Sequence, residues 1–355
     1  MAEDLSGLRA KIDALDDELL ALLNKRAALA RRIGALKAGA SAYRPEREAE
    51  ILRRMAAANG GPLPGEGVAA VFREVISACR ALEQPVRVSY LGPAGTFSEM
   101  AVLRQFGRSA EAQACASIDD VFRDAETSAA HFAVVPVENS TEGAVGRSLD
   151  LLLATPLKIC GEIVLRVHQN LLRKGKGLKG LKRVYSHAQS LAQCQRWLAQ
   201  NLPGAERVPV ASNAEAARVA AKETSSCAIG PEIAAARYGL RMLAANIEDD
   251  ANNRTRFLVL GGIEPGPTGR DGTSIVLSAP NRPGAVHALL TPIARHGVSM
   301  SRLESRPMRV GKWEYYFFVD LEGHRTDAPV AAALAELEKL APFLKILGSY
   351  PIAVA

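Results

Sequence analysis

The stretch LLALLNKRAALARRIGALK, residues 19–37, belongs to an apolar stripe that starts near the N-terminus and is interrupted once by a charge. In alternating steps of three and four, the stripe comprises Leu5, Leu8, Ile12, Leu15, Leu19, Leu22, Arg26, Leu29, Ile33 and Leu36. This spacing predicts one helix from about Asp4 to Lys37, roughly 50 Å long at 1.5 Å per residue. Two shorter helices cannot cover such a seam, so we expect a second copy of the chain against it.

Two further helices are predicted before residue 84. RPEREAEILRRMAAA, residues 44–58, begins the second, with Pro45 suited to a first turn, and the Gly/Pro-rich stretch 60–67 ends it. A third helix is expected from about Val68 to Leu82, where apolar residues recur at helical spacing. Residues 1–84 are therefore predicted to form an all-helical domain.

Several charged residues are predicted to converge inside this small bundle. Lys37 lies eleven residues, about three turns, after Arg26 and so shares its face. Charges facing an interior are costly unless a ligand satisfies them, although an isolated arginine can also extend its head group to solvent. The group predicts a site for a compact polyanion, and it comprises Arg26, Lys37, Arg47, Glu48 and Glu83.

Composition restricts the remaining possibilities. The 355 residues are 48% hydrophobic, enough for two or three packed domains, and the net charge of +6 is spread among interspersed acids. This pattern argues against a dedicated nucleic-acid surface. Five scattered cysteines without a CxxC pair predict neither zinc nor disulfides, and the chain shows neither a secretory signal nor an apolar run of about 18 residues. We expect a cytoplasmic protein that does not bind a membrane.

From residue 85 onward, short β-rich runs alternate with Ala-rich helical segments, which predicts an α/β domain with a largely parallel sheet. Polar clusters follow these strands or begin helices, where a cleft between two lobes would use them. The clusters lie in GPAGTFSE (92–99), PVENSTEG (136–143), VYSHAQSLAQCQRWL (184–198) and NNRTRF (252–257). The sequence contains neither a metal-ligand cluster nor a Gly-rich nucleotide loop, so no cofactor and no metal are expected.

The C-terminal segment reads strand, helix, strand, strand, helix, strand, after a Gly/Pro-rich linker at residues 262–272. That order is typical of a ferredoxin-like α+β domain. The predicted domains are therefore 1–84, 86–263 and 272–355.

Residues 5–83 resemble the chorismate mutases of the all-helical class, whose sites lie between the helices of an intertwined homodimer. The blocks LRAKIDALDDELL, NKRAALARRIGALK and PEREAEIL carry the resemblance. It implies that Lys37 and Glu83 are catalytic, and that substrate is bound by Arg9, Arg26, Arg47, Glu48 and Cys79. Arg9 is 17 residues, roughly 25 Å, from Arg26, so it must serve the site of the partner chain. A carboxylate at position 83 donates a hydrogen bond only when protonated, so we expect mutase activity to fall as pH rises.

Residues 86–263 resemble prephenate dehydratase through GPAGTFSE, PVENSTEG and NNRTRF. The family fold has two lobes like those of periplasmic binding proteins, with substrate in the cleft. The resemblance implies that Thr255 donates an essential hydrogen bond, and that Thr96, Ser98, Asn139, Ser186, Gln193 and Arg256 bind substrate, Arg256 by pairing with a carboxylate. Glu138 and His187 are alternative acids, or structural residues.

The C-terminal segment resembles an ACT regulatory domain of the phenylalanine-sensing kind. PGAVHAL supplies Gly284, Ala285 and Val286, and ESRP supplies Glu304, Ser305 and Arg306 as predicted effector ligands. Backbone N–H groups at the start of the helix after Gly284 suit a carboxylate.

The order of the three segments is that of the bifunctional chorismate mutase/prephenate dehydratases of phenylalanine biosynthesis. The resemblance implies chorismate and prephenate as substrates and L-phenylalanine as a feedback inhibitor. Two alternatives stay open. The helices could serve only to dimerise a monofunctional dehydratase, or the chain could be a non-catalytic amino-acid sensor.

Overall fold

The computed structural model describes residues 4–37, 41–280, 282–308 and 315–353. The chain divides into two compact units, Met1–Val86 with Phe106–Glu111, and Arg87–Gln105 with Ala112–Ala355. Each unit is described by itself below. Within the described residues, no helix combines the length and the apolar character that crossing a membrane requires.

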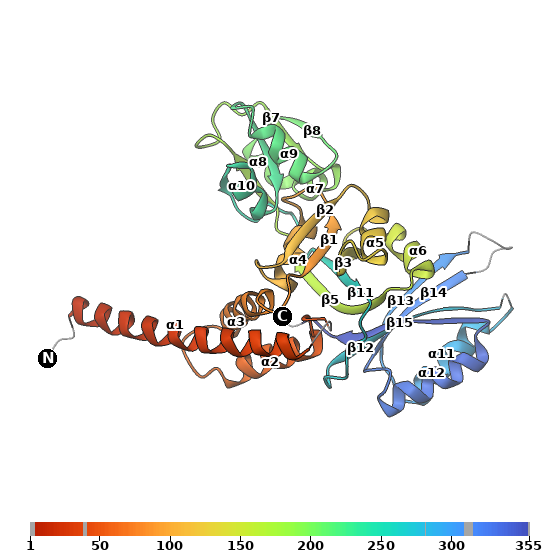
Figure 1. Ribbon diagram of the computed structural model, residues 1–355. Helices are drawn as coiled ribbons and strands as arrows, with labels where there is room; N and C mark the ends of the chain where they lie inside the picture. The colour runs from red at the N-terminus through yellow and green to blue at the C-terminus, as the bar shows by residue number, and fades with distance from the viewer. Residues whose placement is uncertain (1–3, 38–40, 281, 309–314, 354–355) are drawn as a thin grey trace. The chain divides into compact units, whose positions relative to one another are not determined.

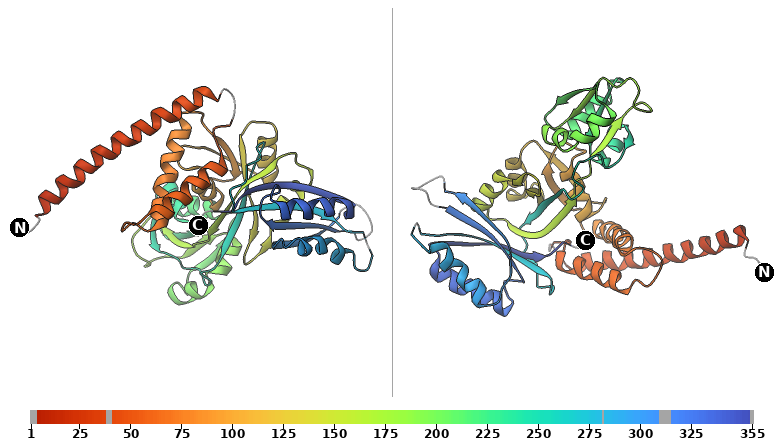
Figure 2. Two further views of the ribbon diagram at one scale, coloured as in Figure 1. Left: turned by 90° about the horizontal axis from the view of Figure 1, so that it is seen from below. Right: turned by 180° about the vertical axis from the view of Figure 1, so that it is seen from behind.

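The first unit is helical, as predicted, and consists of α1 (Leu5–Leu36), α2 (Pro45–Ala58) and α3 (Gly65–Ala81) (Figure 1). Asp4 caps α1 by accepting a hydrogen bond from the backbone N–H of Gly7 at 2.7 Å. The apolar stripe of α1 is largely uncovered in the single chain: Leu15 is 63% exposed and Leu22 is 61% exposed. Figure 2 shows α1 as one continuous helix that extends beyond its contacts with α2 and α3.

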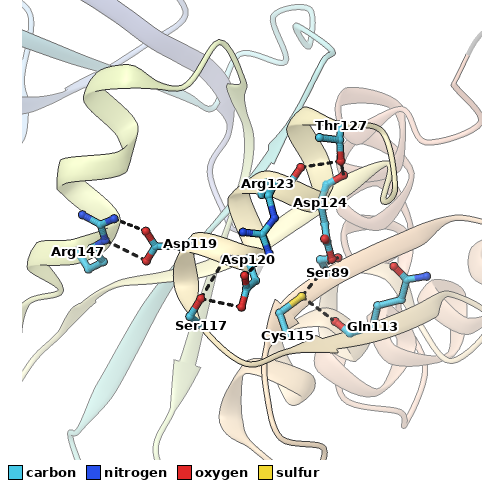
Figure 3. Close-up of polar contacts among 10 residues, drawn as sticks. All are labelled: Ser89, Gln113, Cys115, Ser117, Asp119, Asp120, Arg123, Asp124, Thr127 and Arg147. Carbon is cyan, nitrogen blue, oxygen red and sulfur yellow. Dashed lines mark hydrogen bonds and ion pairs between the residues drawn. The ribbon is translucent and has the colours of Figure 1, made fainter.

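The second unit begins with a lobe built on a sheet of order β2-β1-β3-β11-β5, with the short β4 paired to β3. Its strands and helices are β1 (Arg87–Leu91), α4 (Phe97–Phe106), β2 (Glu111–Cys115), α5 (Ile118–Glu126), β3 (Phe132–Asn139), β4 (Gly143–Ala144), α6 (Gly146–Ala154), β5 (Lys158–Arg166) and β11 (Arg254–Gly261). Figure 3 shows how α5 is held in this lobe: Asp124 accepts from Ser89 of β1 at 2.8 Å, and Asp119 pairs with Arg147 of α6.

A second lobe is inserted between β5 and β11, and its sheet has the order β10-β6-β9-β7-β8. It comprises β6 (Asn170–Arg173), β7 (Arg183–Ser186), α7 (Ala188–Gln193), α8 (Gln195–Asn201), β8 (Glu206–Pro209), α9 (Asn213–Ala220), β9 (Ser226–Gly230), α10 (Glu232–Tyr238) and β10 (Arg241–Ala244). Both sheets are mixed rather than largely parallel. The chain returns from the second lobe as β11, which pairs antiparallel with both β3 and β5, and β6 runs antiparallel to both of its neighbours.

The last part of the second unit has the predicted ferredoxin-like order, with an antiparallel sheet β13-β14-β12-β15. Its elements are β12 (Asp271–Ser278), α11 (Ala285–Arg295), β13 (Met300–Pro307), β14 (Tyr315–Glu322), α12 (Ala328–Leu340) and β15 (Phe343–Pro351). Helices α11 and α12 cover one face, where Ile275 and Leu277 point (Figure 1). Val276, on the opposite face, joins the core of the first lobe. The regulatory sheet and the first lobe thus share one hydrophobic core.

The closest approach in this shared core is at Gly348 of β15, where an added Cβ would collide with the backbone of Ile159 in β5. We predict that Gly348→Ala lowers the free energy of unfolding of the second unit by about 1–3 kcal/mol, because two backbones must separate. The control is Gly262→Ala, since nothing lies within 4 Å of an added Cβ there. Calorimetry of the full chain measures both, and equal thermal stability of the two variants would contradict the prediction.

Candidate active sites

The helical unit contains a cavity of about 280 Å³ where the C-terminal half of α1 meets the start of α2 and the end of α3. Five cationic side chains and two carboxylates line it, together with apolar residues and Cys79. The charged residues are Arg26, Lys37, Arg44, Arg47, Glu48, Arg80 and Glu83. An excess of positive charge in a partly enclosed space favours binding of a small polyanion.

The structure brings together the predicted residues of this site with one exception. Lys37 Nζ lies 3.5 Å from Glu83 Oε2, and Arg26 donates to the Val75 carbonyl oxygen at 3.4 Å. Arg47 pairs at 2.6 Å with Glu50, and both side chains are more than half exposed. Arg9 is exposed on the N-terminal part of α1 and does not line the cavity.

Arg80, which sequence reasoning missed, is the most buried cation of the cavity, with a side chain only 4% exposed. It pairs with Glu48, donates to the carbonyl oxygen of Phe106 and lies 5.3 Å from the centre of the Tyr43 ring. Burial raises the pKa of Glu48, and the charge of Arg80 opposes that rise. Helical spacing was an available signal, because Arg80 follows Ile76 by four residues on the inward face of α3.

The second site is a cleft of about 430 Å³ that residues from both lobes of the second unit line. Thr96 and Ser98, at the start of α4, face Asn139 and Thr255 of the first lobe and Gln193 of the second. Beside the cleft, Glu99 pairs with Arg237, and the Tyr238 hydroxyl donates to the Ala94 carbonyl oxygen at 2.9 Å, so the lobes are joined there.

Asn139 fixes the orientation of Thr255. Its Oδ1 accepts from the backbone N–H groups of Thr141 and Glu142 at 3.0 and 3.2 Å, so its Nδ2 is the end that donates. That Nδ2 donates to Thr255 Oγ1 at 2.9 Å and to Asn253 Oδ1 at 2.8 Å. Because Thr255 Oγ1 accepts this bond, its own hydroxyl hydrogen can point into the cleft.

Other buried amide groups of the cleft walls have polar atoms that lack a partner. Gln169 Nε2 donates to Gln193 Oε1 at 3.2 Å, which leaves Gln193 Nε2 buried without a hydrogen-bond acceptor. Asn253 Nδ2 likewise lacks an acceptor, and Gln169 Oε1 lacks a donor. A buried amide atom without a partner is costly, so each of these atoms is a candidate for a hydrogen bond to a ligand or to an ordered water.

None of the described residues that line this cleft is a lysine or an arginine, and His187 is the one ionisable side chain among them. The cleft therefore presents neutral donors: amides, hydroxyls and the N–H groups at the start of α4. Preorganised dipoles of this kind can hold anions in a site from which water is excluded.

Two predicted cleft residues lie elsewhere. Ser186 is fully buried behind the wall, where its hydroxyl oxygen lies 3.0 Å from Asn213 Oδ1 and 2.9 Å from the Ile229 carbonyl oxygen, and Asn213 lines the cleft in its place. Arg256 is on the opposite side of β11 from Thr255, because neighbouring residues of a strand point to opposite faces. Its guanidinium pairs with Glu162 and Asp320, which corrects the expected contact with a substrate carboxylate. Glu138 also points away and pairs with Arg302.

The predicted effector residues lie at two places in the C-terminal domain, the start of α11 and the strand β13. Gly284 caps α11 with φ +75°, open space surrounds the position of an added Cβ, and Ala285 and Val286 follow in the first turn. Glu304, Ser305 and Arg306 lie on β13, an edge strand. Arg306 donates to Asp150 of α6 at 2.9 Å, so this motif also contacts the first lobe.

Comparison with known proteins identifies three family models along the chain. They are chorismate mutase type II at residues 8–84, prephenate dehydratase at 88–264 and the ACT domain at 273–339. A bifunctional chorismate mutase/prephenate dehydratase of Neisseria gonorrhoeae is 54% identical over 98% of this chain and 96% of its own length. The corresponding enzyme of Stutzerimonas stutzeri is 48% identical over 99% of both chains. A prephenate dehydratase structure from Arthrobacter aurescens, in complex with L-Phe, matches 75% of this chain and 90% of its own at 36% identity with a TM-score of 0.70.

The Arg80–Glu48 pair predicts a dependence of stability on pH. In Arg80→Met, the buried Glu48 loses its cation, so its pKa in the folded chain rises further above the value in the unfolded chain. As pH rises above the pKa of Glu48 in the unfolded chain, the unfolded chain releases the proton while the folded chain keeps it. The free energy of unfolding therefore falls as pH rises. Relative to the parent, we expect a deficit of about 1–3 kcal/mol at about pH 5, from the lost hydrogen bond to Phe106, and a larger one of about 3–5 kcal/mol at about pH 8.

Calorimetry of the full chain at both pH values measures this difference. The matched control is Arg47→Met, whose pair with Glu50 is exposed and should contribute little at either pH. If the deficit in Arg80→Met is the same at both pH values, the pair of Arg80 with Glu48 is not what makes stability depend on pH.

Proposed function

The chain belongs to the family of bifunctional chorismate mutase/prephenate dehydratases, and from this membership we propose which residues perform each reaction. The enzyme rearranges chorismate to prephenate, and removes carbon dioxide and water from prephenate to give phenylpyruvate. We assign the first reaction to the cavity of the helical unit and the second to the cleft of the α/β lobes. The observation that carries this assignment is the contrast between a cation-rich cavity and a cleft of neutral donors.

The mutase reaction is pericyclic and needs no covalent catalysis. The enzyme must hold the dicarboxylate in its reactive conformation and stabilise negative charge that develops on the ether oxygen. We assign the carboxylates to Arg26 and Arg47, and the ether oxygen to Lys37 and Glu83. The 3.5 Å separation of Lys37 Nζ from Glu83 Oε2 supports this assignment, because both groups can then reach one oxygen. Glu48 and Cys79 would contact the remainder of the substrate.

We propose that each mutase cavity is completed by Arg9 of a second chain, in a homodimer whose α1 helices are intertwined. Two observations support this. The exposed stripe of α1 needs a cover about as long as itself, and Arg9 is too far along α1 to reach the cavity of its own chain. The site therefore depends on dimerisation.

In the dehydratase cleft, we propose that Thr255 donates a hydrogen bond to the departing hydroxyl of prephenate. Asn139 occupies the acceptor side of Thr255, so the proton of Thr255 is directed to substrate. Gln193 Nε2, Asn253 Nδ2 and the start of α4 with Thr96 and Ser98 would hold the two carboxylates. Ser186 would act indirectly, by fixing Asn213.

The ACT domain is the proposed site of feedback inhibition by L-phenylalanine, which is one transamination from the product. The start of α11 after Gly284 suits the carboxylate of an amino acid, and Glu304 and Ser305 of the edge strand suit its ammonium group. The complex of the Arthrobacter aurescens relative with L-Phe supports the identity of the effector.

The role of Thr255 can be tested by two substitutions. Thr255→Val keeps the shape and removes the hydroxyl, and we expect the dehydratase kcat to fall at least about 100-fold. Thr255→Ser should retain most of the activity, and the mutase activity of both variants should be unchanged. Normal dehydratase turnover by Thr255→Val would exclude the proposed hydrogen bond.

Mixed dimers test whether Arg9 acts across the interface. Arg9→Ala and Arg26→Ala should each abolish mutase activity alone. In an equimolar mixture after subunit exchange, half of the dimers are hybrids with one intact cavity, so we expect about a quarter of the parental activity to return. If Arg9 served its own chain, the mixture would stay inactive.

Feedback inhibition can be tested with an effector-site variant that has a matched control. Gly284→Asp places a negative charge where the carboxylate of phenylalanine would bind, and we expect the inhibitory concentration of L-phenylalanine to rise at least about tenfold. The control is Gly297→Asp at the other end of α11, a position with a similar φ of +68° and open space. Dehydratase activity that excess phenylalanine does not change in the parent enzyme would refute the proposal.

A further inference from the structure

The second arginine of the NNRTRF motif, Arg256, contacts the ACT domain and β5 and does not line the cleft. Arg256 Nε pairs with Glu162 Oε2 of β5 at 2.8 Å, Nη1 with Asp320 of β14, and Nη2 donates to the Tyr350 hydroxyl of β15 at 2.9 Å. All three of its nitrogens are therefore engaged, and the side chain is only 18% exposed. Burial alone would lower the pKa of Arg256, but the contacts with these three groups outweigh it, so the guanidinium stays charged.

The ACT side of this contact is itself fixed. The Ser274 hydroxyl donates to Asp320 and lies 2.7 Å from the Tyr350 hydroxyl oxygen, and all three residues are buried. A fully satisfied polar network in a buried environment is rigid, because every alternative arrangement leaves a charge without a partner.

A second and more exposed ion pair also links the neighbouring strand to the ACT sheet. Glu138 of β3 pairs with Arg302 of β13 at 2.7 Å, and Glu138 is the residue opposite Arg256 in the β3–β11 register. Asn139 and Thr255 are opposite each other in the next pair, and both face the cleft. Thr255 and Asn139 of the cleft are therefore the sequence neighbours of Arg256 and Glu138, which pair with residues of the ACT sheet.

The strand pairing itself is interrupted at this place. Arg256 lies opposite Glu138, but the next residue, Phe257, lies opposite Pro136, so Val137 is an additional residue in β3. Such a bulge disrupts the hydrogen-bond ladder locally, and proline contributes no N–H to it. The ladder is therefore weakened beside Thr255 on the β3 side only, because the pairing with β5 continues without a break from Arg254 to Val259. The side-chain contacts of Arg256 add to this β5 pairing in fixing the backbone next to Thr255.

We propose that Arg256 is a positioning residue of the dehydratase reaction, which Asp320 and Tyr350 of the ACT domain hold so that Thr255 and Asn139 keep their catalytic geometry. The ACT sheet is then a structural part of the dehydratase site as well as a regulatory domain. This inference rests on the proposed role of Thr255.

The test uses three variants of the full chain with kcat and KM measured for prephenate. Asp320→Asn keeps the shape and removes the charge that holds Arg256, Arg256→Met removes the guanidinium, and the third variant carries both changes. Dehydratase rates are divided by the mutase rate of the same preparation, which reports the amount of chain whose helical unit is folded. The control is Glu336→Gln, which removes a partly exposed carboxylate of the ACT domain that pairs with Arg295.

We expect each single change to lower kcat roughly 10- to 100-fold with KM little altered, because small displacements of a catalytic group are costly. The double variant should be no worse than the poorer single variant, because both changes break one contact. Arg256→Lys should recover part of the loss, since it keeps the charge but not the branched geometry. Glu336→Gln should behave as the parent.

Two results would overturn the inference. If Arg256→Met raises KM strongly while Asp320→Asn is silent, Arg256 contacts substrate. If both variants have normal kcat, the ACT contact does not position Thr255. Arg256→Met leaves two buried carboxylates unpaired, so if it fails to fold, Asp320→Asn alone decides between these outcomes. Failure of the proposed function itself would appear separately, as a parent enzyme without dehydratase activity or a Thr255→Val variant with normal activity.

Discussion

Strand β11 is the constraint on which the second unit depends. It is the segment by which the chain returns from the second lobe, and it inserts antiparallel between β3 and β5. Near the start of this strand, Thr255 points from one face to the cleft, and Arg256 points from the other face to the regulatory sheet. Further along, Phe257 to Leu260 are buried, so the same strand joins the catalytic cleft, the shared core and the ACT contact.

In the proposed assignment, the mutase cavity and the dehydratase cleft recognise anionic substrates by opposite electrostatic means. The mutase cavity concentrates five cations, one of them fully buried and stacked on Tyr43, and so suits a reaction in which negative charge develops on one oxygen. The dehydratase cleft instead directs neutral amide and hydroxyl donors at its ligand. Neutral donors can hold carboxylates without the cost of placing unpaired cations in a closed cleft. In this assignment, one chain binds two related dianions, one with cationic side chains and the other with neutral donors.

Much of this arrangement could be predicted from the sequence. Periodicity located the three N-terminal helices and placed Arg26 and Lys37 on one face of the first. The resemblance added Glu48 and Glu83, which lie on α2 and just after α3. It is harder to predict from sequence which of two adjacent strand residues faces a site. The NNRTRF motif presents Thr255 and Arg256 together, but strand alternation allows only one of them to face the cleft. Arg80 and Asn213 were missed because their roles depend on contacts with distant partners, Phe106 in one case and Ser186 in the other.

The most direct test of the central claim, that one chain performs both reactions at separate sites, is turnover of chorismate by the purified protein. Loss of chorismate and formation of phenylpyruvate are followed separately in the same reaction. The account predicts that chorismate is consumed and that phenylpyruvate appears after transient prephenate. If chorismate is untouched while added prephenate is consumed, the helical unit serves only for dimerisation. If neither is consumed, the chain is a sensor, and both site assignments fail.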